Sequence, residues 1–262
     1  WISPGGIRSM FPKLSGRKTS SAINNPRVPD GSRIYAVGDI HGRRDLIEKI
    51  HDLIAADAAG SDVPRKVVVY LGDYIDRGEE SRQVVDFLLD NPLPDFENIY
   101  LKGNHEDVLI KFLSGTSIDP GWIYYGGDNT LCSYDVTASS PFRNQWNLEQ
   151  MQAHLKRNLS TRHLEFYQTL QISHLEGDYC FVHAGVVPKV PLEKQEEENV
   201  LWIRGEFLNS KANHGRIIVH GHTIRSKPEV FPNRIGIDTG AYSSGILTCL
   251  VLQKDHQSFL HT

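Results

Sequence analysis

The chain has 262 residues, of which 39% are hydrophobic, so one large or two small domains with a sizeable core can form. Its formal net charge of −4 provides no general polyanion-binding surface, which disfavours nucleic acid as an obligate partner. Because no run of 18 apolar residues occurs, we expect no membrane span. Three cysteines, an odd number at unrelated spacings, indicate reduced core residues of a cytoplasmic protein rather than a disulfide framework.

Residues 1–30 are rich in Ser, Pro, Gly, Lys and Arg and lack the apolar centre of a signal peptide. We expect them to form a loosely ordered leader, followed by a folded domain over residues 31–262.

The first half of that domain alternates between strand and helix patterns. Apolar runs predict strands at 34–37, 67–71 and 99–101, and amphipathic spacing predicts helices at 46–59, 81–89 and 106–113. This alternation indicates parallel strands joined by right-handed crossovers.

The alternation stops after Ser114. Residues 115–161 are rich in Gly, Asn, Ser and aromatic residues, with one helix predicted at 148–158. An interruption of this length in a compact domain is usually a lid or a binding insert. Its aromatic residues Trp122, Tyr124 and Tyr125 either stack on a substrate or, as we favour, form a small core within the insert.

The remainder of the chain is rich in strands. Patterns predict strands at 179–182, 216–219, 235–237 and 246–252, a short helix near 203–209, and a solvated acidic loop at 193–198. The most economical architecture is an α/β fold in which two sheets pack face to face, with helices outside.

Five glycine-flanked polar clusters follow apolar runs, at the points where buried strands would end. They are Gly38-Asp39-Ile40-His41-Gly42, Gly72-Asp73-Tyr74-Ile75-Asp76-Arg77-Gly78, Gly103-Asn104-His105-Glu106, His183-Ala184-Gly185 and His220-Gly221-His222. Glycine allows sharp backbone turns and leaves room for ions. Asp, His and Asn side chains delivered to one rim of a sheet make a dinuclear metallohydrolase the leading hypothesis.

The clusters contain donors for two ions. Asp39 and His41, two residues apart in extended chain, can point the same way and bind one ion. Asp73 begins a loop in which its two carboxylate oxygens can bridge two ions. Neutral donors for the second ion are Asn104, His183 and His222. This oxygen and nitrogen set suits Mn²⁺, Fe or Zn²⁺ better than Ca²⁺, and two such ions would assist an in-line phosphoryl displacement.

Four further residues have the chemistry for catalysis and phosphate binding. His105 is better placed as a general acid than as a ligand, and Asp76 can accept its second ring N–H. Arg77 and Arg204 are candidates to bind phosphate oxygens, with surface ion pairing as the alternative. His220 is expected to support the ligands rather than to bind metal. Seven histidines without ligand context are expected at the surface: His51, His154, His163, His174, His214, His256 and His261.

In their order, the motifs GDIHG, GDYIDRG, GNHE, VHAG and GHT resemble the bacterial-type phosphoprotein phosphatase family of the calcineurin-like metallophosphoesterases, over about residues 34–252. The resemblance implies a four-layer αββα sandwich of two mixed sheets with a dimetal site at the sheet edge. It also implies specific roles: Asp39 and His41 hold the first metal, Asp73 bridges, and Asn104, His183 and His222 hold the second. The implied general acid is His105 with Asp76, and the implied phosphate ligands are Arg77, Arg204 and Asn104.

The tail of the chain departs from the eukaryotic members. Residues 236–241, GIDTGA, resemble bacterial relatives, including symmetrical diadenosine tetraphosphate hydrolases. Those hydrolases typically lack an Asp at the position of Asp76 and have Asp where this chain has Glu106. Ile224 replaces a histidine found in many distant metallophosphoesterases. These residues favour a protein phosphatase.

We therefore expect a phosphomonoesterase that acts on phosphorylated Ser, Thr or Tyr in proteins, through direct attack by a hydroxide bridging two metals, with Mn as the first choice. The alternative within this class is a dinucleoside polyphosphate hydrolase, with Tyr124 or Trp122 stacking on adenine. The alternative from another class is a non-catalytic module that binds phosphoproteins, although such a module would not need His105 and Asp76.

Overall fold

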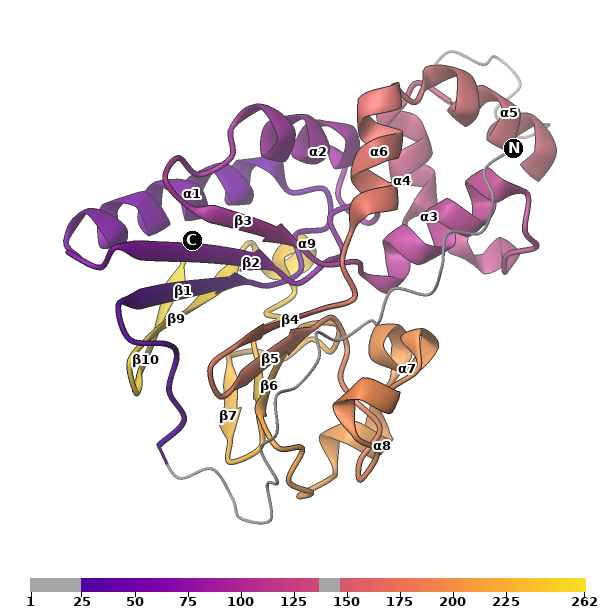
Figure 1. Ribbon diagram of the computed structural model, residues 1–262. Helices are drawn as coiled ribbons and strands as arrows, with labels where there is room; N and C mark the ends of the chain where they lie inside the picture. Colours follow the sequence, from indigo (N-terminus) through magenta and orange to yellow (C-terminus); the bar gives the residue numbers. More distant parts are fainter. Residues whose placement is uncertain (1–24, 137–146) are drawn as a thin grey trace.

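The computed structural model describes residues 25–136 and 147–262, which build two five-stranded sheets (Figure 1). The first sheet consists of β1 (Ser32–Val37), β2 (Arg65–Tyr70), β3 (Glu97–Tyr100), β9 (Thr248–Gln253) and β10 (His256–His261). Its order is β10-β9-β1-β2-β3. The three N-terminal strands are parallel, and β9 joins β1 in antiparallel register.

The second sheet is also mixed. It consists of β4 (Ser173–Glu176), β5 (Tyr179–Val182), β6 (Ile217–His220), β7 (Glu229–Phe231) and β8 (Arg234–Gly236), in the order β4-β5-β6-β8-β7. The central strands β5, β6 and β8 are parallel, whereas both edge strands are antiparallel to their neighbours. Apolar side chains of both sheets, including Ile34, Val67, Phe181 and Val219, form a buried layer between them.

Helices cover the outer faces, so the predicted four-layer αββα sandwich is confirmed (Figure 1). The first sheet is covered by α1 (Arg44–Ala59) and α2 (Ser81–Asp90), and the second by α7 (Glu197–Trp202) and α8 (Gly205–Leu208). In α1, Leu46, Ile47, Ile50 and Ile54 fall on the buried face, as the helical period requires.

A second group of helices gathers at one end of the sheets (Figure 1). It contains α3 (Asn104–Ser114), α4 (Gly127–Ser133), α5 (Leu148–Asn158) and α6 (Thr161–Thr169), with the short 3₁₀ helix η1 (Pro120–Ile123). Helix α3 ends at Gly115, whose φ of 81° is the left-handed conformation that glycine adopts without strain. The predicted insert is thus helical on both sides of residues 137–146, which lie outside the described part of the chain.

The sequence patterns located the central strands well, and α5 has the predicted bounds. They missed β4, β7, β10, α4 and α6. The acidic run predicted as a loop is instead divided between the 3₁₀ helix η2 (Leu192–Lys194) and the first turn of α7. The short helix predicted near 203–209 is α8, which begins at Gly205 and ends at Leu208.

The proposed leader lies mostly outside the described residues. Residues 25–30, its last part, pack on the folded domain: Val28 is 2% exposed, and its backbone N–H donates to the carbonyl of Lys254 at 3.0 Å. The ordered chain therefore begins at least six residues before residue 31.

Two histidines expected at the surface are buried instead. His51 lies on the buried face of α1, where its Nε2 is 2.7 Å from the hydroxyl of Tyr70. His163 of α6 lies 2.8 Å from the Tyr134 hydroxyl through Nδ1 and 2.9 Å from an Asp86 oxygen through Nε2. Both rings therefore make side-chain hydrogen bonds on the helical side of the first sheet, which local sequence patterns did not indicate.

Candidate metal centre

The polar clusters meet at the carboxyl ends of strands from both sheets. Asp39 follows β1, Asp73 follows β2 and Asn104 follows β3, while His183 follows β5 and His222 follows β6. Parallel strands present these ends at the same edge, and face-to-face packing brings the two edges together. The structure therefore gathers donors that are up to 183 residues apart in the chain.

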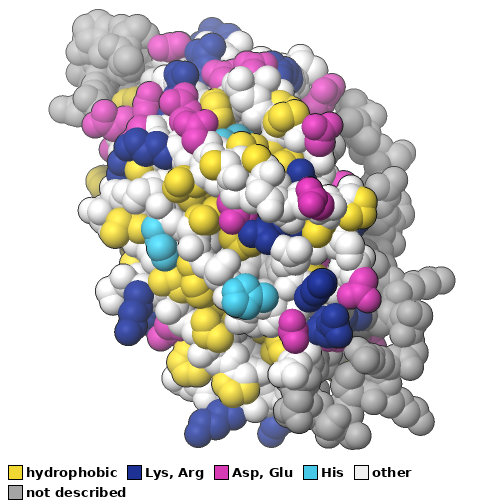
Figure 2. Space-filling view, turned by 90° about the vertical axis from the view of Figure 1, so that its left-hand side faces the viewer, with side chains coloured by type: hydrophobic (Ala, Val, Ile, Leu, Met, Phe, Trp, Pro, Cys, Tyr) yellow, Lys and Arg dark blue, Asp and Glu magenta, His cyan; other side chains and the backbone are white. Residues whose placement is uncertain are grey.

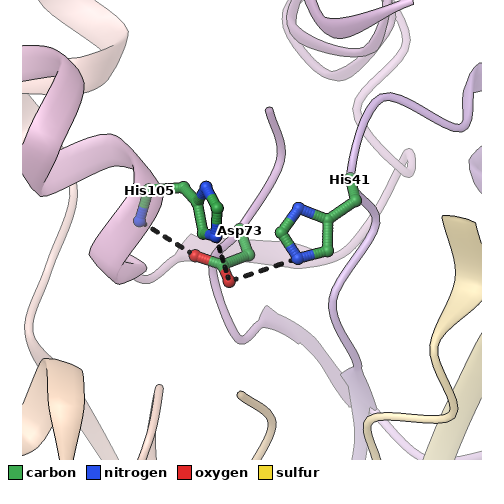
Figure 3. Close-up of side chains that lie close together, drawn as sticks. All are labelled: His41, Asp73 and His105. Carbon is green, nitrogen blue, oxygen red and sulfur yellow. Dashed lines mark hydrogen bonds and ion pairs between the residues drawn. The ribbon is translucent and has the colours of Figure 1, made fainter. Parts of the chain in front are cut away.

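The first donor set lies around Asp73, and Figure 3 shows its carboxylate between the rings of His41 and His105. The Nδ1–H of His41 donates to the carbonyl of Ile75 at 2.8 Å, which leaves a lone pair on Nε2. Burial lowers the pKa of His41 to about 3, so the ring is neutral. Its Nε2 nevertheless lies 3.4 Å from Asp73 Oδ2, so two acceptors face each other.

The second donor set also contains a ring nitrogen whose lone pair faces other acceptor atoms. The Nδ1–H of His183 donates to the carbonyl of Leu71 at 2.9 Å, and burial lowers the pKa of this ring. Its Nε2 therefore presents a lone pair to Asn104 Oδ1 at 2.9 Å and to Asp73 Oδ1 at 3.4 Å. His222 Nδ1 lies 2.8 Å from the same Asn104 oxygen, and burial lowers the pKa of His222 to about 2.

Asp39 adds a further carboxylate. Its Oδ2 accepts the backbone N–H of His222 at 2.9 Å, whereas its Oδ1 is buried without a hydrogen-bond partner. Gly221 lies against this oxygen so closely that a Cβ would collide with it. A Cβ at Gly103 would collide with Asp73 Oδ1 in the same way. Glycine at these two positions keeps the space around the carboxylates open.

These atoms fit metal ions. Buried atoms without hydrogen-bond partners among the described residues include Asp39 Oδ1, His41 Nε2 and His222 Nε2. Buried polar atoms are normally paired, and opposed acceptors repel unless a cation lies between them. Two clusters, His41-Asp73-His105 and Asp73-His183-His222, have ligand atoms within 4.8 Å of one another. Because Asp73 belongs to both, the carboxylate expected to bridge two ions is the one that can reach both positions.

Asp238 is a third buried carboxylate near the centre, and its motif was not among the predicted donors. It follows β8, and its Oδ2 has no hydrogen-bond partner. Burial raises the pKa of Asp238 to about 6, while burial followed by the charges of Asp238 and Asp73 raises that of Asp39. The run Gly236-Ile237-Asp238-Thr239-Gly240 repeats the pattern of Asp after a strand between glycines, which could have revealed it.

Glu106 supports the loop that carries Asp73. Its Oε2 accepts the backbone N–H groups of Asp73 and Gly103, both at 2.9 Å, and its Oε1 accepts that of Tyr74 at 2.8 Å. The side chain is fully buried. Glu106 therefore joins the first turn of α3 to the loop after β2 and fixes the backbone of the central carboxylate.

The expected general acid and its partner are in contact. His105 Nδ1 lies 2.6 Å from Asp76 Oδ2. Burial alone would lower the pKa of His105, but the neighbouring charges of Asp73 and Asp76 outweigh it and raise the pKa overall. Asp76 also accepts hydrogen bonds from Trp122 Nε1, at 2.7 Å, and from the hydroxyl of Thr130. Trp122 packs in the core, as favoured, and in addition contacts the partner of His105.

A cavity of about 760 Å³ opens beside His105 and Asn104. Both arginines line it: the Arg77 guanidinium carbon lies 4.8 Å from the ring centre of Tyr242, and Arg204 Nη1 donates to the His222 carbonyl at 3.2 Å. The insert forms another wall, with side chains from Asp119, Trp122, Tyr124, Tyr125, Asp128 and Asn129. Arg77, Arg204 and the insert therefore share one cavity with His105.

His220 lies outside both donor clusters. Its Nδ1 is 3.1 Å from the carbonyl of Gly221, and its ring packs on Phe207 at 5.1 Å between centroids. Its Nε2 lies 3.4 Å from Arg234 Nη1. The side chain occupies the core beneath the turn that carries His222, in agreement with a supporting position.

A layered α/β sandwich whose strand ends hold opposed acceptors beside a buried histidine–aspartate pair defines the class of metallophosphoesterases. A family model described as calcineurin-like phosphoesterase matches residues 32–241. The chain belongs to this family, whose members use a dinuclear metal site.

Curated relatives carry two kinds of name. Serine/threonine-protein phosphatase 2 of Escherichia coli K12 is 30% identical over 227 residues, covering 82% of this chain and 90% of the relative. The asymmetrical bis(5'-nucleosyl)-tetraphosphatase PrpE of Anoxybacillus flavithermus is 25% identical over 234 residues, covering 82% and 88%. Together they support a phosphate-ester hydrolase and leave the substrate open.

Solved structures share the fold. The crystal structure of a putative diadenosine tetraphosphatase aligns with a TM-score of 0.55 at 21% identity, over 87% of this chain and 93% of the other. A mutant cold-active protein tyrosine phosphatase aligns with a TM-score of 0.54 at 16% identity, over 98% of this chain and 90% of the other.

In residues 25–136 and 147–262, no helix combines the length and apolar character needed to cross a membrane.

Proposed function

We propose that this protein is a metal-dependent protein phosphatase that hydrolyses phosphoserine, phosphothreonine or phosphotyrosine. The observation that carries the proposal is the His105–Asp76 pair, which lies beside the metal centre at the wall of an open cavity. A module that only binds phosphoproteins has no use for a buried acid in this position. The name of the E. coli relative supports the same substrate class.

The donor set indicates which residues would hold two metal ions. Asp39 and His41 suit one ion, Asp73 suits both, and Asn104, His183 and His222 suit the other. The oxygen and nitrogen donors favour Mn²⁺, with Fe or Zn²⁺ as alternatives. When bound, such ions supply positive charge to phosphate oxygens and make a water molecule more acidic.

Phosphate binding and proton transfer are carried out by side chains of the protein. Arg77 and Arg204, on the cavity wall, can hold the phosphate oxygens through their guanidinium groups. As the oxygen of a water molecule forms a bond to phosphorus and the bond to the leaving oxygen breaks, His105 donates its Nε2 proton to that leaving oxygen, so the alcohol or phenol and inorganic phosphate are released. Asp76 accepts the Nδ1–H, which orients the ring and stabilises its protonated form.

A dinucleoside polyphosphate hydrolase is the second candidate, favoured by exposed Tyr124 and Tyr125 in the cavity and by the PrpE relatives. Against it, Asp119 and Asp128 line the same wall, and their negative charge would repel a polyphosphate chain. A phosphopeptide with basic residues next to its phosphorylated residue would instead be attracted.

The deciding experiment compares kcat/KM for diadenosine tetraphosphate and for a phosphopeptide with flanking lysines, using protein loaded with Mn²⁺. We expect the phosphopeptide to be preferred, and Asp119→Asn with Asp128→Asn to reduce the preference for lysine. A higher kcat/KM for the dinucleotide, lost in Tyr124→Ala, would support the second candidate. Failure to hydrolyse even p-nitrophenyl phosphate would favour a non-catalytic module.

We also propose a phosphorylated protein or peptide as the partner and the cytoplasm as the location. Cys180 and Cys249 are buried free thiols rather than members of a disulfide, which suits a reducing compartment. On the face in Figure 2, basic and acidic side chains are interspersed, an arrangement that does not favour nucleic acid. Subcellular fractionation of the native host tests the location, and a nucleic-acid binding assay tests the expectation that nucleic acid is not a partner.

A further inference from the structure

The carboxylate of Asp76 receives hydrogen bonds from three elements. Oδ2 accepts from His105 Nδ1 at 2.6 Å and from Trp122 Nε1 at 2.7 Å, and Oδ1 accepts from the Thr130 hydroxyl. An indole N–H can only donate, so the oxygen shared by His105 and Trp122 must be an acceptor. All four side chains are buried. Two of the three donors belong to the insert.

The geometry points to Trp122 and Thr130 as positioning residues that act on the general acid through Asp76, and this inference rests on the proposed phosphatase function. A carboxylate held by His105 alone could rotate about its side-chain bonds. Donors on both oxygens remove that freedom. The plane of the carboxylate then sets the direction of His105 Nδ1–H, and so the direction in which Nε2 faces the cavity.

Trp122 also contacts the helix that carries His105. Its ring packs on Phe112 of α3, with centroids 5.1 Å apart. A Cβ at Gly127 would collide with the indole, so the backbone of α4 approaches this ring as closely as it can. Trp122 is thereby fixed on both sides while its N–H reaches Asp76. A change at Trp122 that keeps an aromatic ring but removes the indole N–H tests this contact, with thermal unfolding to report the loss of packing.

A purely structural role for the two residues would need no polar atoms. Val has nearly the same shape as Thr, and Phe keeps an aromatic ring in place of the larger indole, yet both native side chains direct a donor to the same carboxylate. Thr130 is engaged further, because its Oγ1 also accepts the Asp76 backbone N–H at 2.9 Å. The insert therefore fixes both the backbone and the side chain of Asp76, whose φ of 69° is itself strained.

The test uses Trp122→Phe and Thr130→Val, with Thr169→Val as the matched control. Thr169 is exposed on α6, and its hydroxyl donates to carbonyls of its own helix. Each Mn²⁺-loaded variant is assayed on a phosphoserine peptide, whose alkoxide must be protonated, and on p-nitrophenyl phosphate, whose phenolate leaves more readily without a proton. Metal content and thermal unfolding are measured alongside.

We expect kcat on the phosphopeptide to fall about 10- to 100-fold in either variant, with KM and metal content unchanged. The fall on p-nitrophenyl phosphate should be much smaller, and Thr169→Val should match the wild type. In a His105→Asn background, Trp122→Phe should cause no additional loss, since the group that it positions is absent.

Equal losses on both substrates, or an undiminished loss in the His105→Asn background, would overturn the positioning role. A variant that loses metal in proportion to its activity would overturn it as well. If the wild type hydrolyses neither substrate, the proposed function itself fails, and this outcome is distinct because no variant is needed to see it.

Discussion

Several residues of the site, taken singly, lower the stability of the folded protein. His41, Asp73, Asp76, Arg77 and His222 all have φ between 47° and 69°, a region that side chains other than glycine rarely adopt. Each such residue costs on the order of 1–3 kcal/mol. Three buried carboxylates, Asp39, Asp73 and Asp238, repel one another as well. Bound cations would offset that repulsion.

Asp39→Asn should therefore affect stability in opposite directions with and without metal. In the presence of a chelator we expect the variant to melt about 2–4 °C above the wild type, corresponding to about 1 kcal/mol, because one of three repelling carboxylates is removed. With Mn²⁺ the melting temperature of the wild type should rise more than that of the variant, so the wild type becomes the more stable protein. The variant has lost a metal ligand and should therefore also lose turnover.

Thermal unfolding with and without Mn²⁺ measures this reversal. Asp62→Asn is the control, because Asp62 is exposed and remote from the centre. A lower melting temperature for Asp39→Asn in chelator would contradict the repulsion argument. Full Mn²⁺ stabilisation and wild-type turnover of the variant would contradict the assignment of Asp39 as a ligand.

His105→Asn should separate catalysis from metal binding. We expect kcat to fall about 10²- to 10⁴-fold, because the leaving oxygen no longer receives a proton from a positioned acid. The metal content should remain, since neutral donors from Asn104, His183 and His222 are unchanged. Elemental analysis beside kinetics on a phosphopeptide checks both parts. Loss of the metal together with activity would make His105 a ligand instead.

At the scale of elements, each strand ends in a tight turn whose geometry depends on a neighbouring element. Glu106 is the example with most contacts, because one carboxylate in the first turn of α3 accepts backbone N–H groups from two loops. Buried N–H groups that lose their acceptor are costly. The position of Asp73 therefore depends on α3 as much as on β2.

Glu106→Gln should weaken both the fold and the site. The amide replaces one acceptor oxygen by a donor, so at least one buried backbone N–H loses its partner, at about 1–3 kcal/mol. We expect a matching loss in the free energy of unfolding in urea and weaker Mn²⁺ binding in titrations. Glu165→Gln, an exposed change on α6, is the control. Unchanged Mn²⁺ affinity would show that the loop keeps its shape without Glu106.

The same dependence explains what the sequence could and could not predict. Strand β2 was predictable because it is covered on both faces and is a continuous apolar run. Strands β4 and β10 were missed, since edge strands are part-exposed and mix polar with apolar residues. Asp76 was predictable as the partner of His105 from motifs alone. Its contact with Trp122 spans 46 residues and depends on how the insert folds back, which no local pattern encodes.

At the scale of the whole molecule, the site requires the two sheets to keep a fixed relation. Asp39, Asp73 and Asn104 come from the first sheet, and His183 and His222 from the second. At the opposite ends of the strands, Arg65 of β2 binds Glu176 of β4 through two hydrogen bonds, at 2.9 and 2.6 Å. It also binds Glu97 of β3. Arg65 therefore links both sheets at the end remote from the metal centre.

The Arg65–Glu176 link should give stability a specific dependence on pH. Burial alone would raise the pKa of Glu176, but hydrogen bonds from His174 and Arg65 outweigh it and lower the pKa from 4.5 to about 2. A carboxyl whose pKa is lowered in the folded state stabilises that state above its unfolded pKa. The contribution is therefore complete above about pH 5 and is lost as the pH falls from 4.5 towards 2.

Glu176→Gln should destabilise the protein at pH 7 by on the order of 1–2 kcal/mol, less than the pKa shift alone implies, because Arg65 is partly exposed. The difference in the free energy of unfolding in urea between variant and wild type should persist down to pH 5. It should shrink at pH 3.5, because protonation of Glu176 has begun to remove the stabilisation in the wild type. Glu97→Gln is the matched control on the same arginine: its side chain is 52% exposed, so its removal should cost less. A difference that is independent of pH, or one no larger than that of Glu97→Gln, would mean that this ion pair does not hold the sheets together.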